Sequence, residues 1–249
     1  MTAPIGVIGG TALAELTALE AAGNPAPAST PYGPSSGPLV CGRFAGRDTC
    51  FVMRHGPGHR LAPHRINYRA NIRALADAGC RQVIAVAAVG GITPAMRAGR
   101  IVVPDQIIDY SWGRAHSFHD DPAGGSLDHI DFTEPYDSAL RTAILETARR
   151  LDLAPADGGV HGVTQGPRLE TAAEIDRMER DGCDIVGMTG MPEAALAREA
   201  GLDYACCAVV VNKAAGRSGG SAIHAEIEAT LTRGMANVER ILEQLLPSL

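Results

Sequence analysis

The chain has 249 residues, of which 45% are apolar and 20% charged, and its formal net charge at pH 7 is −6. This length and composition fit one soluble globular domain with a sizeable core. The negative charge argues against a general nucleic-acid surface, which needs clustered Lys and Arg, although one arginine can still hold an anionic ligand. No apolar run approaches membrane-spanning length, so we expect neither nucleic acid nor a membrane as a partner.

Apolar runs and turn residues predict the elements of the N-terminal half. In chain order these are a strand at 4–10, a loop at 24–38, a β-hairpin at 39–54, a loop at 54–64, a helix at 67–78 and a strand at 82–89. The loop at 24–38 is predicted from its content of Pro, Ser and Gly. The run at 82–89 is apolar throughout, as in strands that are covered on both faces.

The C-terminal half continues the alternation of strands and helices. It predicts strands at 100–109, 159–165, 184–188 and 204–211, and helices at 138–151, 170–181, 193–200 and 225–246. The segment 111–128 is rich in His, Asp and Gly and lacks a period, so we expect a long functional loop there. With no repeat and no linker, the chain predicts a single α/β domain over residues 1–249, built on a central mixed β-sheet flanked by helices.

The cysteines and histidines lack the spacing of a metal or redox motif. The cysteines are Cys41, Cys50, Cys80, Cys183, Cys206 and Cys207, and none forms a Cys-x-x-Cys pair. We therefore expect reduced thiols, a cytoplasmic location and, because the first residues form a short strand without a basic segment, no signal peptide. His55, His59 and His64 are irregularly spaced without an obvious carboxylate, so we expect no metal.

Four segments end an apolar run in small or polar residues. They are Ile8-Gly9-Gly10-Thr11, Arg54-His55-Gly56, residues 184–191 and residues 209–212. Ligands of open α/β sheets bind beyond the strand ends, so we expect these segments to converge on one pocket. The glycine pair before Thr11 is either an anion-binding nest or a tight turn, and Arg54 offers a planar cation to phosphate oxygens.

Three further positions allow either a functional or a purely structural interpretation. Gly90-Gly91 is either a second backbone nest, with an N–H near Ala88 available to an anion, or a strand-end turn. Glu170 either favours the start of a helix or accepts a hydrogen bond from a ligand. Asn212 either forms a turn or serves a ring nitrogen and a carbonyl oxygen together.

Six segments resemble those of one family and occur in that family's order. They are Ile8-Gly9-Gly10-Thr11, Arg54-His55-Gly56, Asn67-Tyr68-Arg69-Ala70-Asn71, Val89-Gly90-Gly91, Gly166-Pro167-Arg168 and Met188-Thr189-Gly190-Met191-Pro192-Glu193-Ala194. Over nearly the whole chain, the sequence resembles the trimeric purine nucleoside phosphorylase and methylthioadenosine phosphorylase family, and most closely its S-methyl-5′-thioinosine phosphorylases. The resemblance implies that a homotrimer cleaves a purine nucleoside with inorganic phosphate, giving free base and sugar 1-phosphate without a metal or organic cofactor.

The resemblance also implies roles for single residues. The residues that would hold phosphate are Thr11, Arg54, His55, the Ala88 backbone and Thr189. Those that would hold the nucleoside are Met188 under the ribose, Asn212, Ala214 and Glu170 at the base, and Leu169 where the family usually places a Phe. His129 would reach a neighbouring subunit's site, and His224 falls where inosine- and guanosine-specific members carry a histidine for the 5′-hydroxyl.

Asn212 and Glu170 favour a 6-oxopurine over adenine. Adenine-specific relatives place Asp at the positions of Asn212 and Ala214, whereas an amide can donate toward O6 while it contacts N7. A 6-oxopurine carries a proton on N1 that Glu170 could accept, and a mismatched buried polar contact discriminates strongly. We therefore expect phosphorolysis of S-methyl-5′-thioinosine to hypoxanthine and 5-methylthioribose 1-phosphate in purine salvage, with Asn212 and His55 as catalytic residues.

The main alternative is an inosine/guanosine phosphorylase, which His224 favours. A methylthioadenosine phosphorylase, a nucleoside hydrolase and a non-catalytic nucleoside-binding protein are less favoured. A hydrolase usually carries an Asp-rich calcium cluster, for which the irregularly spaced residues 116–131 are the only candidate.

Overall fold

The computed structural model describes residues 2–10, 20–21, 27–120, 127–217 and 223–249, with the backbone alone at 20–21 and 223–229. The strands are β1 (Ile5–Gly9), β2 (Glu20–Ala21), β3 (Pro27–Thr30), β4 (Gly33–Phe44), β5 (Arg47–Met53), β6 (Gln82–Gly91), β7 (Ile101–Val103), β8 (Gln106–Asp109), β9 (Ala156–Asp157), β10 (Val160–Val163), β11 (Ile185–Gly187) and β12 (Asp203–Lys213). The helices are α1 (Tyr68–Asp77), α2 (Ser138–Arg150), α3 (Ala172–Arg180), α4 (Gly190–Glu199) and α5 (Ile223–Leu245), with 3₁₀ turns at Pro63–Arg65 and Leu246–Ser248.

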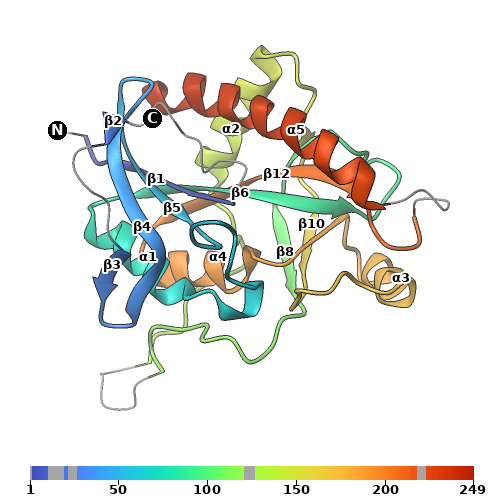
Figure 1. The fold of residues 1–249 in the computed structure, drawn as a ribbon, viewed down its shortest axis with the longest axis horizontal. Coiled ribbons are helices and arrows are strands. Elements are labelled where there is room, and N and C mark those ends of the chain that lie inside the picture. The colour runs from blue at the N-terminus through green and yellow to red at the C-terminus, as the bar shows by residue number, and fades with distance from the viewer. Residues whose placement is uncertain (1, 11–19, 22–26, 121–126, 218–222) are drawn as a thin grey trace.

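Four parallel strands form the centre of the sheet (Figure 1). β1 pairs with β5 and β6, and β6 pairs with β12 along its whole length. The carboxyl ends of these strands therefore lie along one edge. β11 pairs antiparallel with the last residues of β6, so its first residues lie at this edge. This topology confirms the predicted mixed sheet.

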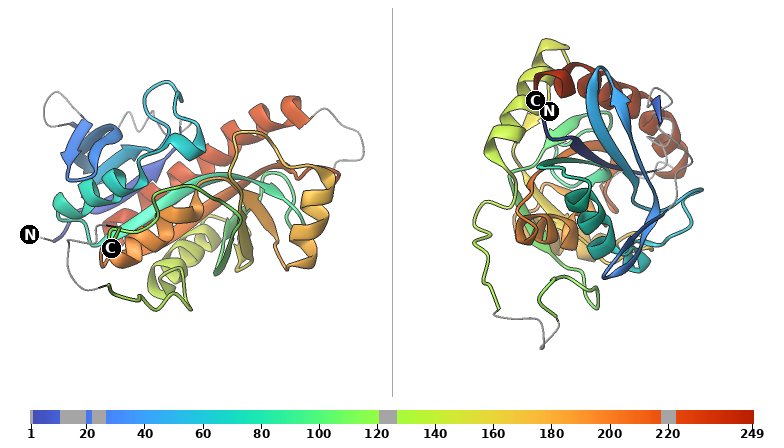
Figure 2. Two further views of the ribbon diagram at one scale, coloured as in Figure 1. Left: turned by 90° about the horizontal axis from the view of Figure 1, so that it is seen from below. Right: turned by 90° about the vertical axis from the view of Figure 1, so that its left-hand side faces the viewer.

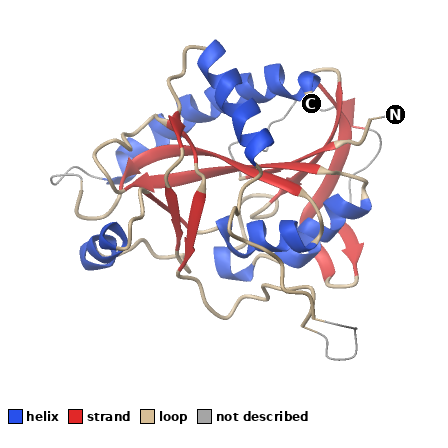
Figure 3. Cartoon of the chain, turned by 180° about the vertical axis from the view of Figure 1, so that it is seen from behind, coloured by secondary structure: helices blue, strands red, loops and turns tan. Residues whose placement is uncertain are grey.

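Alternating side chains of the central strands feed two cores, one on each face of the sheet. Along β6, Val83, Ala85 and Ala87 belong to one core, whereas Ile84 and Val86 belong to the other. Helices α1 and α4 cover the first face, and α2 and α5 cover the second (Figures 2 and 3). Each face is thus buried, as the continuous apolar runs of β6 and β12 indicate.

The helices predicted from periodicity all form, but three element predictions are wrong. The single strand expected at 100–109 is two strands, because β7 pairs with β12 whereas β8 pairs with β10. Part of the expected loop at 24–38 pairs as β3 and the start of β4, because α1 holds this hairpin through hydrogen bonds of Asn67 to Tyr32 and Asn71 to Ser36. Glu170 does not start a helix, since Thr171 caps α3 and Glu174 completes the capping box.

Two further expectations require correction. Gly90-Gly91 forms neither a nest nor a turn but continues β6, where it pairs with both β11 and β12. Cys41 and Cys50 are not reduced thiols. They lie directly opposite each other on β4 and β5 and form a disulfide, whereas Cys80, Cys183, Cys206 and Cys207 are free and buried. In the described part of the chain, no helix is long and apolar enough to cross a membrane.

Candidate active site

A cavity of about 700 Å³ lies beyond the carboxyl ends of the central strands, a volume typical of small-molecule sites. It brings together nine of the predicted site residues: Arg54, His55, Ala88, Leu169, Glu170, Met188, Thr189, Asn212 and Ala214. They come from five separate segments of the chain, which meet because β5, β6 and β12 belong to one set of parallel strands and β11 pairs with the last residues of β6. The predicted convergence of the strand ends is therefore observed.

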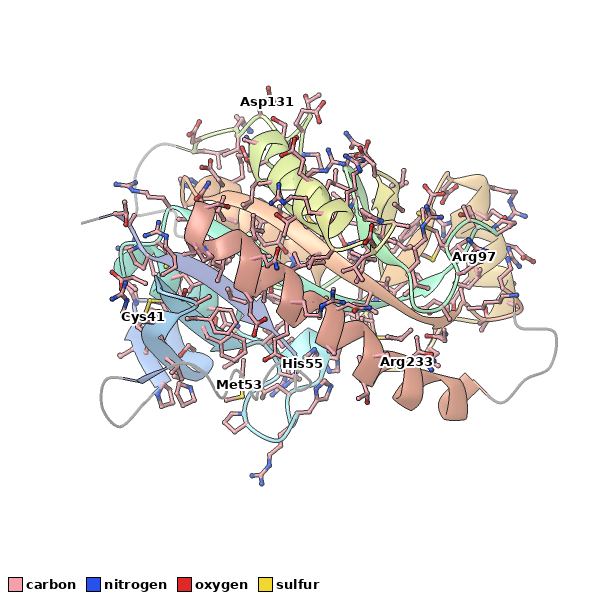
Figure 4. The ribbon with its side chains drawn as sticks, turned by 90° about the horizontal axis from the view of Figure 1, so that it is seen from above. Cys41, Met53, His55, Arg97, Asp131 and Arg233 are labelled. Carbon is pink, nitrogen blue, oxygen red and sulfur yellow. A yellow bond between two sulfur atoms is a disulfide. The ribbon has the colours of Figure 1, made fainter. Side chains whose placement is uncertain are left out.

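Three predicted residues are not placed in this cavity. Thr11 lies outside the described residues, and for His224 the structure describes the backbone alone, in the first turns of α5. His129 is exposed and does not line the cavity. Figure 4 shows Asp131, two residues further along, on a different side of the molecule from His55.

A β-bulge directs Asn212 into the cavity. The pairing of β12 with β6 shifts between Val210 and Asn212, so that Val211 is an extra residue in the strand. Because of this bulge the consecutive residues Val211 and Asn212 both line the cavity, although neighbouring strand residues normally face opposite sides. The Nδ2 atom of Asn212 donates to the Lys213 carbonyl at 2.6 Å, which fixes the amide and leaves a second N–H and the Oδ1 acceptor for a ligand.

The Arg54 guanidinium is held by a buried carboxylate that is not among the predicted site residues. Its Nε and Nη2 atoms donate to Glu193 at 2.6 and 2.8 Å, and Nη1 donates to the Val86 carbonyl at 3.0 Å. The Tyr204 hydroxyl donates to the same carboxylate at 2.8 Å. Burial disfavours the charged guanidinium, but the charge and hydrogen bonds of Glu193 outweigh this effect and raise the pKa of Arg54. Two of its five N–H groups remain for an anion in the cavity.

His55 faces the cavity as a neutral ring. Its Nδ1 atom lies 2.9 Å from the Leu61 carbonyl, which can only accept, so Nδ1 carries the proton. Burial lowers the pKa of His55 to about 4, and the Arg54 charge adds to this effect. At neutral pH, Nε2 is therefore a lone-pair nitrogen that accepts a hydrogen bond from a hydroxyl or from a protonated phosphate oxygen.

Glu170 also lines the cavity and is fixed by a neighbour. The Thr164 hydroxyl donates to Glu170 Oε1 at 2.6 Å. Gly166 lies between Thr164 and Glu170 in the chain and has a φ of 60°. A Cβ on this residue would lie 2.5 Å from the sulfur of Met188. The chain can therefore turn from β10 toward Glu170 only with glycine at this position.

Replacing Thr164 by valine is expected to raise the KM for the nucleoside roughly tenfold, because a hydrogen bond to a charged group is worth about 1.5–3 kcal/mol. The KM for phosphate is expected to stay unchanged. Steady-state kinetics with each substrate varied in turn measures both constants. The matched control is Thr142→Val, which removes a hydroxyl bonded to Ser138 on the exposed side of α2. An unchanged nucleoside KM in Thr164→Val would mean that Glu170 does not contact the nucleoside.

His161 lies buried behind the segment that carries Thr189. Its ring packs against Gly187 and Gly190, its Nδ1 atom is 3.3 Å from the Tyr136 hydroxyl, and its Nε2 has no hydrogen-bond partner among the described residues. Burial lowers the pKa of His161 to about 4, with a further contribution from the charge of Arg54. The ring is therefore neutral in the folded protein at physiological pH.

This buried ring predicts a loss of stability in mild acid. Between pH 6.5 and 4 the unfolded chain binds a proton at His161 and the folded chain does not, so stability falls as the pH is lowered through this range, by up to about 3 kcal/mol. Urea unfolding of wild type and His161→Gln at several pH values measures the difference. The variant is expected to lose this part of the pH dependence, whereas the exposed His64→Gln control keeps it. Equal pH dependence in all three proteins would contradict the assignment.

Several residues at the site were not predicted from the sequence. Glu193 and Thr164 act on predicted residues, and Leu231 and Met235 of α5 line the cavity directly. Glu193 directly follows Met-Thr-Gly-Met-Pro in the family-like segment, so the sequence could have indicated it. The helical spacing of Leu231 and Met235 indicates only core positions. Across the described ranges, no group of three or more His, Cys, Asp or Glu side chains gathers as a metal site would require.

Comparison with known proteins identifies a family with which this chain shares sequence and fold. Residues 4–247 match the family model described as "Phosphorylase superfamily". A protein of Pseudomonas syringae pv. tomato named "Probable S-methyl-5'-thioinosine phosphorylase" is 52% identical over 240 residues, which cover 96% of this chain and 97% of the relative. The 6-oxopurine nucleoside phosphorylase of Pyrococcus furiosus is 40% identical over 222 residues, or 88% of this chain and 83% of the relative. The solved methylthioadenosine phosphorylase from Schistosoma mansoni in complex with adenine superposes with a TM-score of 0.92 at 29% identity, covering 99% of this chain and 92% of that one.

Proposed function

Because the chain belongs to the phosphorylase superfamily, we propose that it catalyses the phosphorolysis of a 6-oxopurine nucleoside, with S-methyl-5′-thioinosine as the preferred substrate. The products are hypoxanthine and 5-methylthioribose 1-phosphate. One observation carries this choice: a single cavity holds Asn212 and Glu170 for the base and the apolar side chains of Leu231 and Met235 for the 5′ substituent. The names of the two relatives support the same substrate class.

The base is recognised by complementary polar groups. The second N–H of the Asn212 amide donates to the purine at O6, and the amide also contacts N7. The Glu170 carboxylate, held by Thr164, accepts a hydrogen bond from the N1–H of a 6-oxopurine. Adenine offers a lone pair at N1, which would face the carboxylate unpaired, and such a mismatch costs a large factor in kcat/KM.

Phosphate attacks the sugar from the opposite end of the cavity. The two remaining N–H groups of Arg54 and the Thr189 hydroxyl hold the anion, and the lone pair on His55 Nε2 accepts from its protonated oxygen. As the glycosidic bond breaks, the sugar gains oxocarbenium character and the purine gains negative charge. The bound phosphate stabilises the sugar and then bonds to its anomeric carbon, while Asn212 stabilises the purine anion. The proton that phosphate loses on forming the ester balances the one that the anion gains to become hypoxanthine.

The proposal further includes inorganic phosphate as co-substrate with no metal or organic cofactor, a homotrimer and a cytoplasmic location. The exposed His129, outside its own cavity, supports an assembly in which a neighbouring subunit presents it to the site. Light scattering during size-exclusion chromatography tests the trimer.

Base release in the presence of phosphate tests the substrate. Methylthioinosine, inosine and methylthioadenosine are compared by kcat/KM at the same phosphate concentration. We expect methylthioinosine to be favoured, because Leu231 and Met235 offer no hydrogen bond to a 5′-hydroxyl. A preference for inosine would instead make His224 a ligand of the 5′-hydroxyl. A preference for methylthioadenosine would overturn the roles of Asn212 and Glu170.

A further inference from the structure

Arg114 is a buried cation whose hydrogen-bond partners are all neutral. It is 8% exposed and lies in the segment between β8 and α2. Its guanidinium donates to five main-chain and side-chain amide oxygens and to one phenol: the carbonyls of Thr164, Gln165, Met188 and Met191, Gln165 Oε1 and the Tyr68 hydroxyl. Burying the charged guanidinium costs hydration free energy, even though all five N–H groups find acceptors. A residue that only linked two loops could do so with a neutral side chain at a lower cost.

Apart from the Tyr68 hydroxyl, the acceptors belong to two segments that contribute residues to the cavity. Residues 164–170, here called the base wall, lead to Glu170, and Arg114 Nη2 bonds the carbonyls of Thr164 and Gln165 at 3.0 and 2.9 Å. Residues 188–191, here called the phosphate floor, carry Thr189, and Arg114 Nη1 bonds the Met188 carbonyl at 2.9 Å and that of Met191. The two segments also meet next to Gly187, whose carbonyl accepts from the Thr164 N–H at 2.9 Å and from the Thr164 hydroxyl at 3.4 Å, whereas Arg114 is the side chain that bonds to both segments themselves.

The segment that carries Arg114 is itself anchored from the other side. The Ser117 hydroxyl and the Phe118 N–H donate to Glu199 of α4 at 2.9 and 2.7 Å. Arg69 of α1 pairs with Asp120 at 3.0 Å. Arg114 therefore extends from a fixed support toward the cavity walls.

We propose that Arg114 is a positioning residue that sets the distance between the base wall and the phosphate floor. The inference rests on the proposed function, in which the base is held by the first segment and phosphate by the second. Each ligand needs only its own segment in order to bind. Cleavage needs both segments in register, because nucleophile, sugar and leaving base must align, and a misplacement of about 1 Å can cost about 100-fold in rate.

The geometry requires arginine rather than any cation. The planar guanidinium directs its N–H groups toward both segments at once, whereas the ammonium of lysine has three donors at a single point. Arg114→Lys therefore keeps the buried positive charge and removes the two-sided bridge. This substitution separates positioning from charge.

The test compares kcat with the binding of each ligand alone. For Arg114→Lys we expect kcat to fall about 10- to 100-fold, while the Kd for inorganic phosphate and the Kd for free hypoxanthine, measured by calorimetry, stay within about threefold of wild type. The matched control is Arg69→Lys, which touches the same loop from the outside and is expected to keep wild-type kcat. A milder second variant, Gln165→Met, removes the Oε1 acceptor that lies 3.1 Å from Arg114 Nε and is expected to lower kcat about threefold if Arg114→Lys does not fold.

The outcomes separate the inference from the proposed function. Wild-type kcat in Arg114→Lys, or in Gln165→Met should the lysine variant not fold, would overturn the positioning role. A loss of phosphate affinity alone, or of hypoxanthine affinity alone, would also overturn it, because Arg114 would then act on one segment only. If the wild-type protein binds both ligands but releases no base, the proposed function fails instead.

Discussion

The Asn212→Ala variant is expected to lose about 100-fold in kcat for nucleoside cleavage while the KM for phosphate stays within about twofold. The Asn212 amide is fixed by its bond to the Lys213 carbonyl and projects into the cavity because of the bulge at Val211. In the proposed mechanism its donor meets the purine where negative charge develops as the glycosidic bond breaks, so its removal affects the transition state more than the ground state.

Stopped or continuous detection of hypoxanthine release, with each substrate varied separately, gives both constants. Asn237→Ala serves as the control, because the Asn237 side chain accepts a hydrogen bond from Arg240 on the exposed side of α5. If kcat in Asn212→Ala stayed near the wild-type value, Asn212 would have no part in leaving-group stabilisation. If only the KM for phosphate rose, Asn212 would contact phosphate and not the purine base.

Replacing Glu193 by glutamine is expected to cost about 3–5 kcal/mol of the free energy of unfolding, because it leaves the buried Arg54 cation without its counter-charge. The two side chains are 3% and 1% exposed, so solvent cannot compensate for the loss. Urea or thermal unfolding measures the effect. In protein that remains folded, the KM for phosphate is also expected to rise, since Arg54 is no longer held at two of its nitrogens.

The exposed pair Arg73–Asp77 on α1 provides the matched control for that experiment. Its atoms are 2.8 Å apart, but both side chains are about half exposed, and such pairs contribute at most about 1 kcal/mol. Asp77→Asn should therefore leave stability and phosphate KM nearly unchanged. A Glu193→Gln protein as stable as Asp77→Asn would show that the Arg54–Glu193 pair is dispensable to the fold.

The central strands were predictable because their signal is local. β6 and β12 are long apolar runs that need cover on both faces, and their parallel pairing brings the ends of several strands together. The same pattern places Asn212, Thr189 and Arg54 at strand ends. The sequence alone therefore predicts that these residues lie together in one cavity.

Features that depend on contacts between distant segments were not predictable. The hairpin of β3 and β4 has a loop-like composition and forms because Asn67 and Asn71 of α1 bond to it. The Cys41–Cys50 disulfide depends on the register of two strands, which no cysteine spacing motif records. Arg114 and Glu193 are separated from their partners by dozens of residues, and the bulge at Val211 leaves no mark in an apolar run.

The dependence of base release on phosphate tests the central claim most directly. Purified protein is incubated with methylthioinosine over a range of phosphate concentrations, including none, and hypoxanthine and inorganic phosphate are both quantified. The account predicts saturable dependence on phosphate, one phosphate consumed per hypoxanthine released, and negligible release in its absence. Release at an equal rate without phosphate, with no phosphate consumed, would show that water is the nucleophile and would contradict the account.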